Sequence, residues 1–157
     1  MSGRVLARLA ELGLSLPPVA APVAAYVPAV RTGNLVHTSG QLPFVDGALS
    51  VTGKVGTEEG DVAPDVAAGL ARTAALNALA AVADLVGDLD SIVRVVKVVG
   101  FVASRPDFTA HPAVINGAST FLGELLGDAG VHARSAVGVA VLPLDSPVEV
   151  ELVVEVA

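Results

Sequence analysis

Residues 92–102 read IVRVVKVVGFV, from Ile92 to Val102, and almost every position is apolar. β-Branched residues at this density are typical of a strand, and Pro106 prevents its extension. Valines occupy both alternating sets of positions, so the pattern predicts a strand that is buried on both faces.

In the sequence, one helix is predicted before this strand and another after it. Asp65 is a candidate cap for a helix running to about Val86, whose alanines allow close approach to a sheet. His111-Pro112 opens a second helix, with proline at a position where its missing N–H costs nothing, and Gly127 ends it. Six residues form the apolar stripe of that second helix: Val114, Ala118, Phe121, Leu122, Leu125 and Leu126.

Strands are predicted over residues 26–30 and 35–39, joined by a tight turn, and over 135–142 and 148–156 near the C-terminus. A second turn is predicted at 45–47, and one further short strand, without assigned bounds, is expected before the first long helix. The order is strand, strand, strand, helix, strand, helix, strand, strand. It predicts an α/β (α+β) fold with one mixed β-sheet of about six strands and two main helices packed on one face.

The other face of this sheet has no segment left to cover it. In the last strand Val148 and Val150 alternate with Glu149 and Glu151, so the glutamates are expected on that second face. Hydrophobic residues make up 53% of the chain. A two-sided apolar strand in so small a domain predicts self-association.

The length of 157 residues predicts a single domain over 1–157, with an N-terminal helix and proline connector over 1–22 and a core over 23–157. Ser2 and Gly13 are the predicted cap and stop of that helix. No cysteine is present, which excludes disulfides and thiolate metal sites.

The formal net charge is −7, from 16 acidic and 9 basic side chains, and no basic patch stands out, so a nucleic-acid partner is not expected. No run approaches 18 uninterrupted apolar residues, and the N-terminus lacks the apolar core of a signal peptide. We therefore expect a cytoplasmic protein without a membrane partner. The three histidines, His37, His111 and His132, lack ligand-like spacing, and no metal site is predicted.

Arg134 lies immediately before the strand predicted from Ser135. Desolvating an unpaired cation costs several kcal/mol, roughly the penalty of a buried ion, so this arginine needs an anionic partner. Its planar donors match a carboxylate or phosphate. A structural Asp or Glu of the same chain and a bound ligand both remain open as that partner.

Three segments resemble one family. YVPAVRTGNLV at residues 26–36, followed by TSGQLP at 38–43, is similar to the N-terminal signature of the RidA (YjgF/YER057c/UK114) proteins. ARSAV at 133–137, with LP at 142–143 and VEVE at 148–151, is similar to the C-terminal signature. The N-terminal helix and connector resemble the extension of a longer branch.

This resemblance implies a chorismate-mutase-like fold and a homotrimer with clefts between subunits. It also implies hydrolytic deamination of reactive 2-imino acids, or their enamine tautomers, to 2-keto acids and ammonia, with no metal or organic cofactor.

The resemblance assigns two catalytic positions, Arg134 as the grip on the substrate carboxylate and Glu149 as the residue that positions water. The further substrate-binding positions that it implies are Tyr26, Ser39, Gly40 and Asn116. Ala136 stands where many members have cysteine, so no thiol takes part.

Two other functions are compatible with the chain. A non-catalytic trimer could bind a small carboxylate or other metabolite through the same arginine, with Glu149 dispensable. An endoribonuclease is the third reading, disfavoured by the acidic charge and by the 3% aromatic content.

Overall fold

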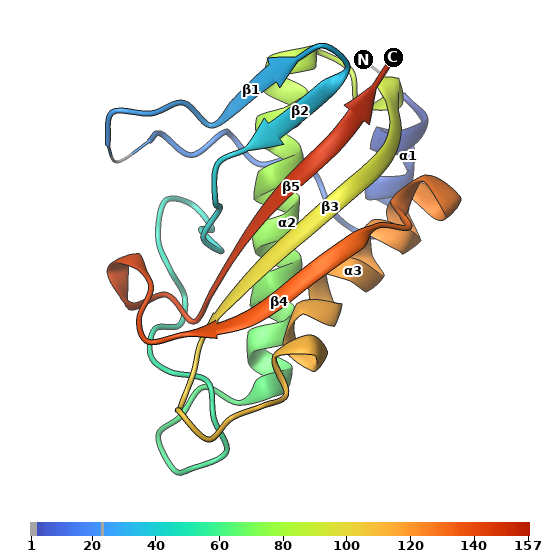
Figure 1. The fold of residues 1–157 in the computed structure, drawn as a ribbon. Coiled ribbons are helices and arrows are strands. Elements are labelled where there is room, and N and C mark those ends of the chain that lie inside the picture. The colour runs from blue at the N-terminus through green and yellow to red at the C-terminus, as the bar shows by residue number, and fades with distance from the viewer. Residues whose placement is uncertain (1–2, 23) are drawn as a thin grey trace.

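The computed structural model describes residues 3–22 and 24–157. Figure 1 shows one twisted sheet with its long helices on the same side. The helices are α1 (Arg4–Glu11), α2 (Pro64–Val86) and α3 (His111–Leu126); short 3₁₀ turns are η1 (Leu89–Ser91), η2 (Gly127–Gly130) and η3 (Pro143–Asp145). The strands are β1 (Ala29–Thr32), β2 (Leu35–Thr38), β3 (Ile92–Ala103), β4 (Ala133–Val139) and β5 (Val148–Val156).

The sheet has five strands in the order β1-β2-β5-β3-β4, with β3 and β4 parallel and the other pairs antiparallel. This confirms the predicted mixed sheet with α2 and α3 on one face. The expected sixth strand does not form. Between Gly40 and α2 the described chain makes only isolated bridges: Gln41 with Val150, Val45 with Ala48, and Val55 with both Val62 and Ser104.

Two strand boundaries differ from the prediction. The first strand begins at Ala29 rather than Tyr26, since Tyr26 lies in a bend ahead of Pro28, which has no N–H to donate. The strand β4 spans Ala133–Val139 rather than 135–142. Its last partner is Ala103 at the end of β3, so the following residues have no strand to pair with.

The predicted ranges of the two long helices are confirmed, but the cap assigned to Asp65 is wrong. The cap position of α2 is Ala63, and Pro64 is the first helical residue. Asp65 lies inside the first turn, where its carboxylate accepts from the Val66 N–H and is near the positive end of the helix dipole.

Small residues set the distance between α2 and α3. Gly117 of α3 faces Ala68 of α2 so closely that an added Cβ would collide with the Ala68 carbonyl oxygen. No residue other than glycine fits there without moving one helix. The alanines of α2 serve the same purpose, and Ala71, Ala74 and Ala78 are fully buried.

By length and composition alone, α2 is apolar enough to cross a membrane. In the fold, 67% of its most apolar window is buried. The apolar character of α2 is therefore accounted for as the core helix of a soluble domain.

The N-terminal helix α1 is held by a residue far along the chain. Gly3 occupies its cap position and provides no side chain, while the predicted cap, Ser2, lies outside the described residues. The Asp90 carboxylate accepts from the Arg4 N–H at 2.7 Å and from the Val5 N–H at 2.8 Å. Asp90 thus satisfies two N–H groups that a helix leaves unpaired at its start.

The core lies between the sheet and the helices, and the other sheet face is open. Along β5 the buried residues are Val148, Val150, Leu152, Val154 and Val156. Glu149, Glu151 and Glu155 are only half-buried on the open side, as predicted, together with Val153. Apolar side chains are also exposed on that side, including Val30 at 52% and Val137 at 43%.

Asp90→Ala should loosen α1 while leaving the sheet folded. The two N–H groups keep the pKa of Asp90 below its ordinary value. This contact is therefore present above the ordinary carboxylate pKa and is lost as the pH falls through the lowered one. We expect faster amide exchange at Arg4 and Val5 in the variant, and in the wild type on acidification. Asp84→Ala, at an exposed carboxylate of α2, is the control; equal exchange in both variants would contradict the capping role.

Candidate functional site

Arg134 extends from β4 toward the helices. Its register partner Val98 is fully buried in the core, so Arg134 lies on the helix-covered face of the sheet, at its edge. The Nη1 atom donates to Asn116 Oδ1 at 2.8 Å and to Ser119 Oγ at 3.2 Å. The Nη2 atom donates to the Pro112 carbonyl oxygen at 3.3 Å. All three acceptors belong to α3.

These acceptors are neutral, so they orient the guanidinium without cancelling its charge. Within residues 3–22 and 24–157 the ion pairs involve other side chains, which leaves Arg134 without a carboxylate partner there. A structural Asp or Glu partner, one of the two alternatives from the sequence, is therefore wrong for this part of the chain.

The hydrogen bonds also select which donors of Arg134 remain. A guanidinium has five N–H donors. Nη1 uses both of its hydrogens and Nη2 uses one, so Nε–H and the second Nη2–H have no partner in the described structure. Adjacent donors of this kind bind a carboxylate through two parallel hydrogen bonds.

Two residues that sequence reasoning missed support this arrangement. His132 Nε2 lies 2.8 Å from Ser119 Oγ, and His132 Nδ1 lies 2.6 Å from the Gly130 carbonyl oxygen. The spacing was a usable signal, since Ser119 is three residues after Asn116 on a helix and His132 is two residues before Arg134.

Glu149 lies on β5 and points to the open face. Its register partner on β3 is Phe101. Gly40 lies against it: a Cβ built on Gly40 would be 2.6 Å from Glu149 Oε1, so the glycine makes room for the carboxylate. Burial raises the pKa of Glu149 above its ordinary value, and the nearby charge of Glu151 adds to this.

Ser39 directly precedes Gly40 in the chain, and a hydrogen bond connects it to the bend that contains Tyr26. The Ser39 hydroxyl donates to the Val27 carbonyl oxygen at 2.7 Å and so ties the Tyr26–Val27 bend to the end of β2. The Tyr26 side chain is 46% exposed. Buried Asn77 of α2 supports the loop that follows Gly40, donating to the carbonyl oxygens of Leu42 and Phe44.

The predicted site residues therefore form two groups. The arginine group is Arg134 with Asn116, Ser119 and His132; the glutamate group is Glu149 with Tyr26, Ser39 and Gly40. Glu149 would lie near Arg134 only if β4 and β5 paired as a hairpin. They do not pair, because β3 lies between the two strands.

Arg134 and Glu149 are also on opposite faces of the sheet. Arg134 is level with Val98 and Glu149 with Phe101, two strands across and three residues along, which is roughly 14 Å between Cα atoms. Within one chain the two side chains cannot act on the same small molecule.

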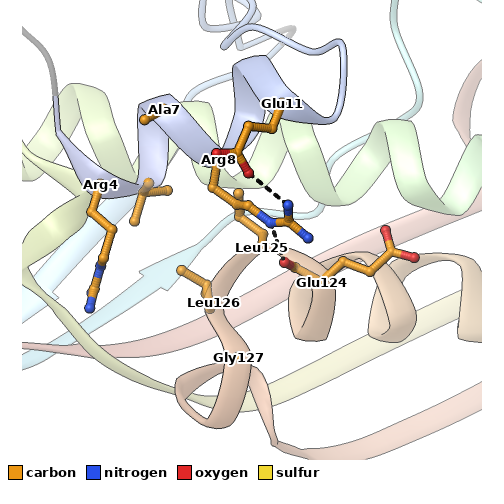
Figure 2. A pocket seen from close by; sticks show the side chains of 9 residues that line it. Arg4, Ala7, Arg8, Glu11, Glu124, Leu125, Leu126 and Gly127 are labelled. Atoms are coloured by element: carbon orange, nitrogen blue, oxygen red, sulfur yellow. Dashed lines mark hydrogen bonds and ion pairs between the residues drawn. The ribbon is translucent and has the colours of Figure 1, made fainter.

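A hollow of about 420 Å³ lies elsewhere, between α1 and the end of α3 (Figure 2). Arg8 extends across it and donates to Glu11 at 2.8 Å and to the Glu124 carbonyl oxygen at 3.1 Å. These polar groups pair with each other, and the lining contains no member of the arginine or glutamate group. The hollow therefore results from the way in which α1 packs beside the end of α3.

The three histidines lie in separate places. His37 is exposed on β2, His111 begins α3 beside Ser104, and His132 belongs to the arginine group. Across the part of the chain that the structure describes, no three His, Asp or Glu side chains gather in a way that could hold a metal ion.

Comparison with known proteins identifies the family to which this chain belongs. Residues 6–156 match the family model described as YjgF/chorismate mutase-like, putative endoribonuclease. The chain is also 44% identical to Protein TCP17 of Trypanosoma cruzi, over 98% of this chain and 95% of that protein. The chain belongs to the YjgF/chorismate mutase-like family, which confirms the resemblance to RidA proteins.

Solved structures agree with this assignment. Atu1372 of Agrobacterium tumefaciens, of unknown function, is 44% identical with a TM-score of 0.88, over 98% of this chain and 93% of that one. A protein of Shewanella oneidensis named a putative endoribonuclease is 34% identical with a TM-score of 0.92, over 97% and 99%. Escherichia coli TdcF, solved with bound serine, is 25% identical with a TM-score of 0.62, over 90% and 94%.

Glu151→Gln should lower the pKa of Glu149 but not return it to the ordinary value, because burial is the larger cause and persists. Carboxyl carbon shifts followed by NMR across pH 3–8 measure this. Glu155→Gln, about 20 Å along the same strand from Glu149, is the control.

The sign of the pH effect on stability also follows. Because the folded-state pKa of Glu149 is raised, its contribution is favourable at low pH and is lost as the pH rises through that pKa. Glu149→Gln should therefore stabilise the fold at pH 7 and not at pH 3. A Glu149 that titrates at or below the ordinary glutamate range would contradict both expectations.

Proposed function

We propose that this protein hydrolyses small 2-imino acids, and their enamine tautomers, to 2-keto acids and ammonia. The observation that carries the proposal is Arg134, a charged guanidinium held by three neutral acceptors with two adjacent donors left over. That geometry favours a ligand with a carboxylate. The serine bound to the relative TdcF also carries a carboxylate next to a nitrogen-bearing carbon, which agrees with this ligand class.

The chemistry needs a base and an oriented substrate. Water attacks the carbon of the protonated imine as Glu149 takes one of the water protons, which gives a neutral carbinolamine. Glu149 then gives this proton to the amino nitrogen. The carbon–nitrogen bond breaks with release of ammonia, and Glu149 takes the hydroxyl proton as the carbonyl forms. A raised pKa makes Glu149 better suited to both transfers. Hydrolysis changes no oxidation state, so the mechanism needs no redox cofactor.

We propose that neighbouring subunits of a homotrimer bring the two groups together. The opposite faces of Arg134 and Glu149 require residues from two chains in one cleft. The open sheet face, with its exposed valines, offers the surface for such contacts. Asn116 would then line the cleft beside Arg134, and Tyr26, Ser39 and Gly40 would line it beside Glu149. We place this activity in the cytoplasm, where amino-acid metabolism generates imines.

A metabolite-binding trimer and an endoribonuclease are the alternatives. The family description includes the second name. The net charge of −7 opposes RNA binding, and the binding trimer differs from the enzyme only in leaving Glu149 unused.

Substitutions of Arg134 and Glu149 test the activity. With 2-iminobutanoate generated in situ by an amino-acid oxidase, and semicarbazide as the competing trap, Arg134→Ala should lose about a hundredfold or more in kcat/KM. Arg134→Lys should recover little, since it lacks the planar fork. Glu149→Gln should keep carboxylate binding and lose about a hundredfold or more in kcat.

Arg8→Ala, at an arginine outside both groups, is the control for these measurements. If the wild-type protein leaves the decay of imines with several side chains unchanged, it is not this enzyme, and the binding trimer replaces the proposal.

Mixed assemblies test whether each cleft uses two chains. Co-expressed Arg134→Ala and Glu149→Gln subunits should form trimers in which about one quarter of clefts regain both native residues, because the two come from different chains. Activity should therefore exceed that of either parent variant. Light scattering supplies the assembly state. A monomer, or mixtures no more active than the parents, would rule out the shared cleft.

A further inference from the structure

We propose that Ser119 and His132 are positioning residues, which fix Arg134 so that its remaining donors face the substrate carboxylate. The inference rests on the proposed function, since it concerns how the same arginine is presented. It adds two residues that act through Arg134 rather than on the substrate.

With a neutral His132 ring, the donors and acceptors allow one arrangement of protons. The Gly130 carbonyl oxygen can only accept, so His132 Nδ1, at 2.6 Å, carries the hydrogen. In the neutral ring Nε2 then has a lone pair and accepts from the Ser119 hydroxyl at 2.8 Å. Ser119 Oγ in turn accepts from Arg134 Nη1, which can only donate.

This direction strengthens the last bond. A hydroxyl that donates to one partner becomes a better acceptor for another. A serine without His132 could rotate its hydrogen toward Nη1 and would then repel it. The histidine therefore ensures that Ser119 presents a lone pair to the guanidinium.

The hydrogen bonds from His132 through Ser119 also reach the Nη1 end of the Arg134 guanidinium. With Asn116 and Ser119, Nη1 is saturated, and Pro112 takes one Nη2 hydrogen. All three anchor the end of the guanidinium that faces α3. The Nε–H and the second Nη2–H are consequently the two donors of Arg134 left without a partner in the described structure.

The structure contains a matched control. Ser104 Oγ lies 3.0 Å from His111 Nε2, a similar serine–histidine pair beside the start of α3. Ser104 makes no hydrogen bond to Arg134. Ser104→Ala thus removes the same kind of contact without touching the proposed chain.

The experiment measures imine hydrolysis, binding of pyruvate and the His132 tautomer in the same set of variants. His132→Leu and Ser119→Ala should each raise KM and the Kd for pyruvate roughly tenfold, the loss typical of a hydrogen bond to a charged group, with kcat nearly unchanged. The double variant should lose little more than either single one, because both break one chain.

Two further readouts separate positioning from a structural role. His132→Gln should recover most of the affinity, since its amide oxygen can accept from Ser119. Nitrogen NMR of histidine-labelled protein should show hydrogen on Nδ1 and a lone pair on Nε2 of His132. Ser104→Ala should keep the wild-type KM and Kd.

The outcomes are distinguishable. If the wild type hydrolyses imines and His132→Leu has the same KM and Kd as the wild type, this inference is overturned and the proposed function stands. Hydrogen on Nε2 of His132 has the same two consequences. Pyruvate binding without hydrolysis overturns the proposed reaction, and the Kd values of the variants then decide the positioning role. Neither binding nor hydrolysis in the wild type overturns both.

Discussion

The position of β3 between β4 and β5 determines how the chemical groups of this protein are distributed. It pairs with β5 on one side and with β4 on the other, so the strands bearing Glu149 and Arg134 are never neighbours. Arg134 is level with Val98 of β3 and Glu149 is level with Phe101, which is three residues further along. Because side chains alternate between the two faces of a sheet, this odd separation places Arg134 and Glu149 on opposite faces. The helix-covered face holds a cation, and the open face holds carboxylates. A protein built this way has two half-sites, and each has its own surroundings.

The environment of Arg134 fixes the position of a charged side chain without neutralising its charge. A carboxylate partner would have stabilised the side chain and also neutralised it. Amide, hydroxyl and carbonyl oxygens satisfy the hydrogen-bonding geometry and leave the charge available. They also restrict the rotamers of a long side chain, so less conformational entropy is lost when a ligand binds.

Local patterns predicted the elements well. The strand at the valines of β3, the alternation of β5 and the His111-Pro112 start of α3 each depend on nearby residues, and the structure has all three. The predicted burial of β3 on both faces is wrong for the single chain, because Val93 and Val96 are exposed on the open face. Contacts between distant residues were the failures. Asp90 caps α1 across 85 residues, and strand pairing beside β3 depends on how the whole chain crosses over. The site residues were identified by resemblance, whereas their grouping required the register, and Ser119 and His132 emerged only from side-chain geometry.

The close approach at Gly117 has a consequence for reading genetic variation in this protein. Gly117 lies next to Asn116 and two residues before Ser119, so any side chain there moves α3 together with the acceptors that hold Arg134. A survey of inactivating variants would return this glycine alongside the polar residues, although it contacts no ligand. Under the proposed function, the spacing of α2 and α3 contributes to the affinity of Arg134 for the substrate carboxylate. Loss of function in a Gly117 variant would therefore result from the displacement of α3 and not from the removal of a chemical group.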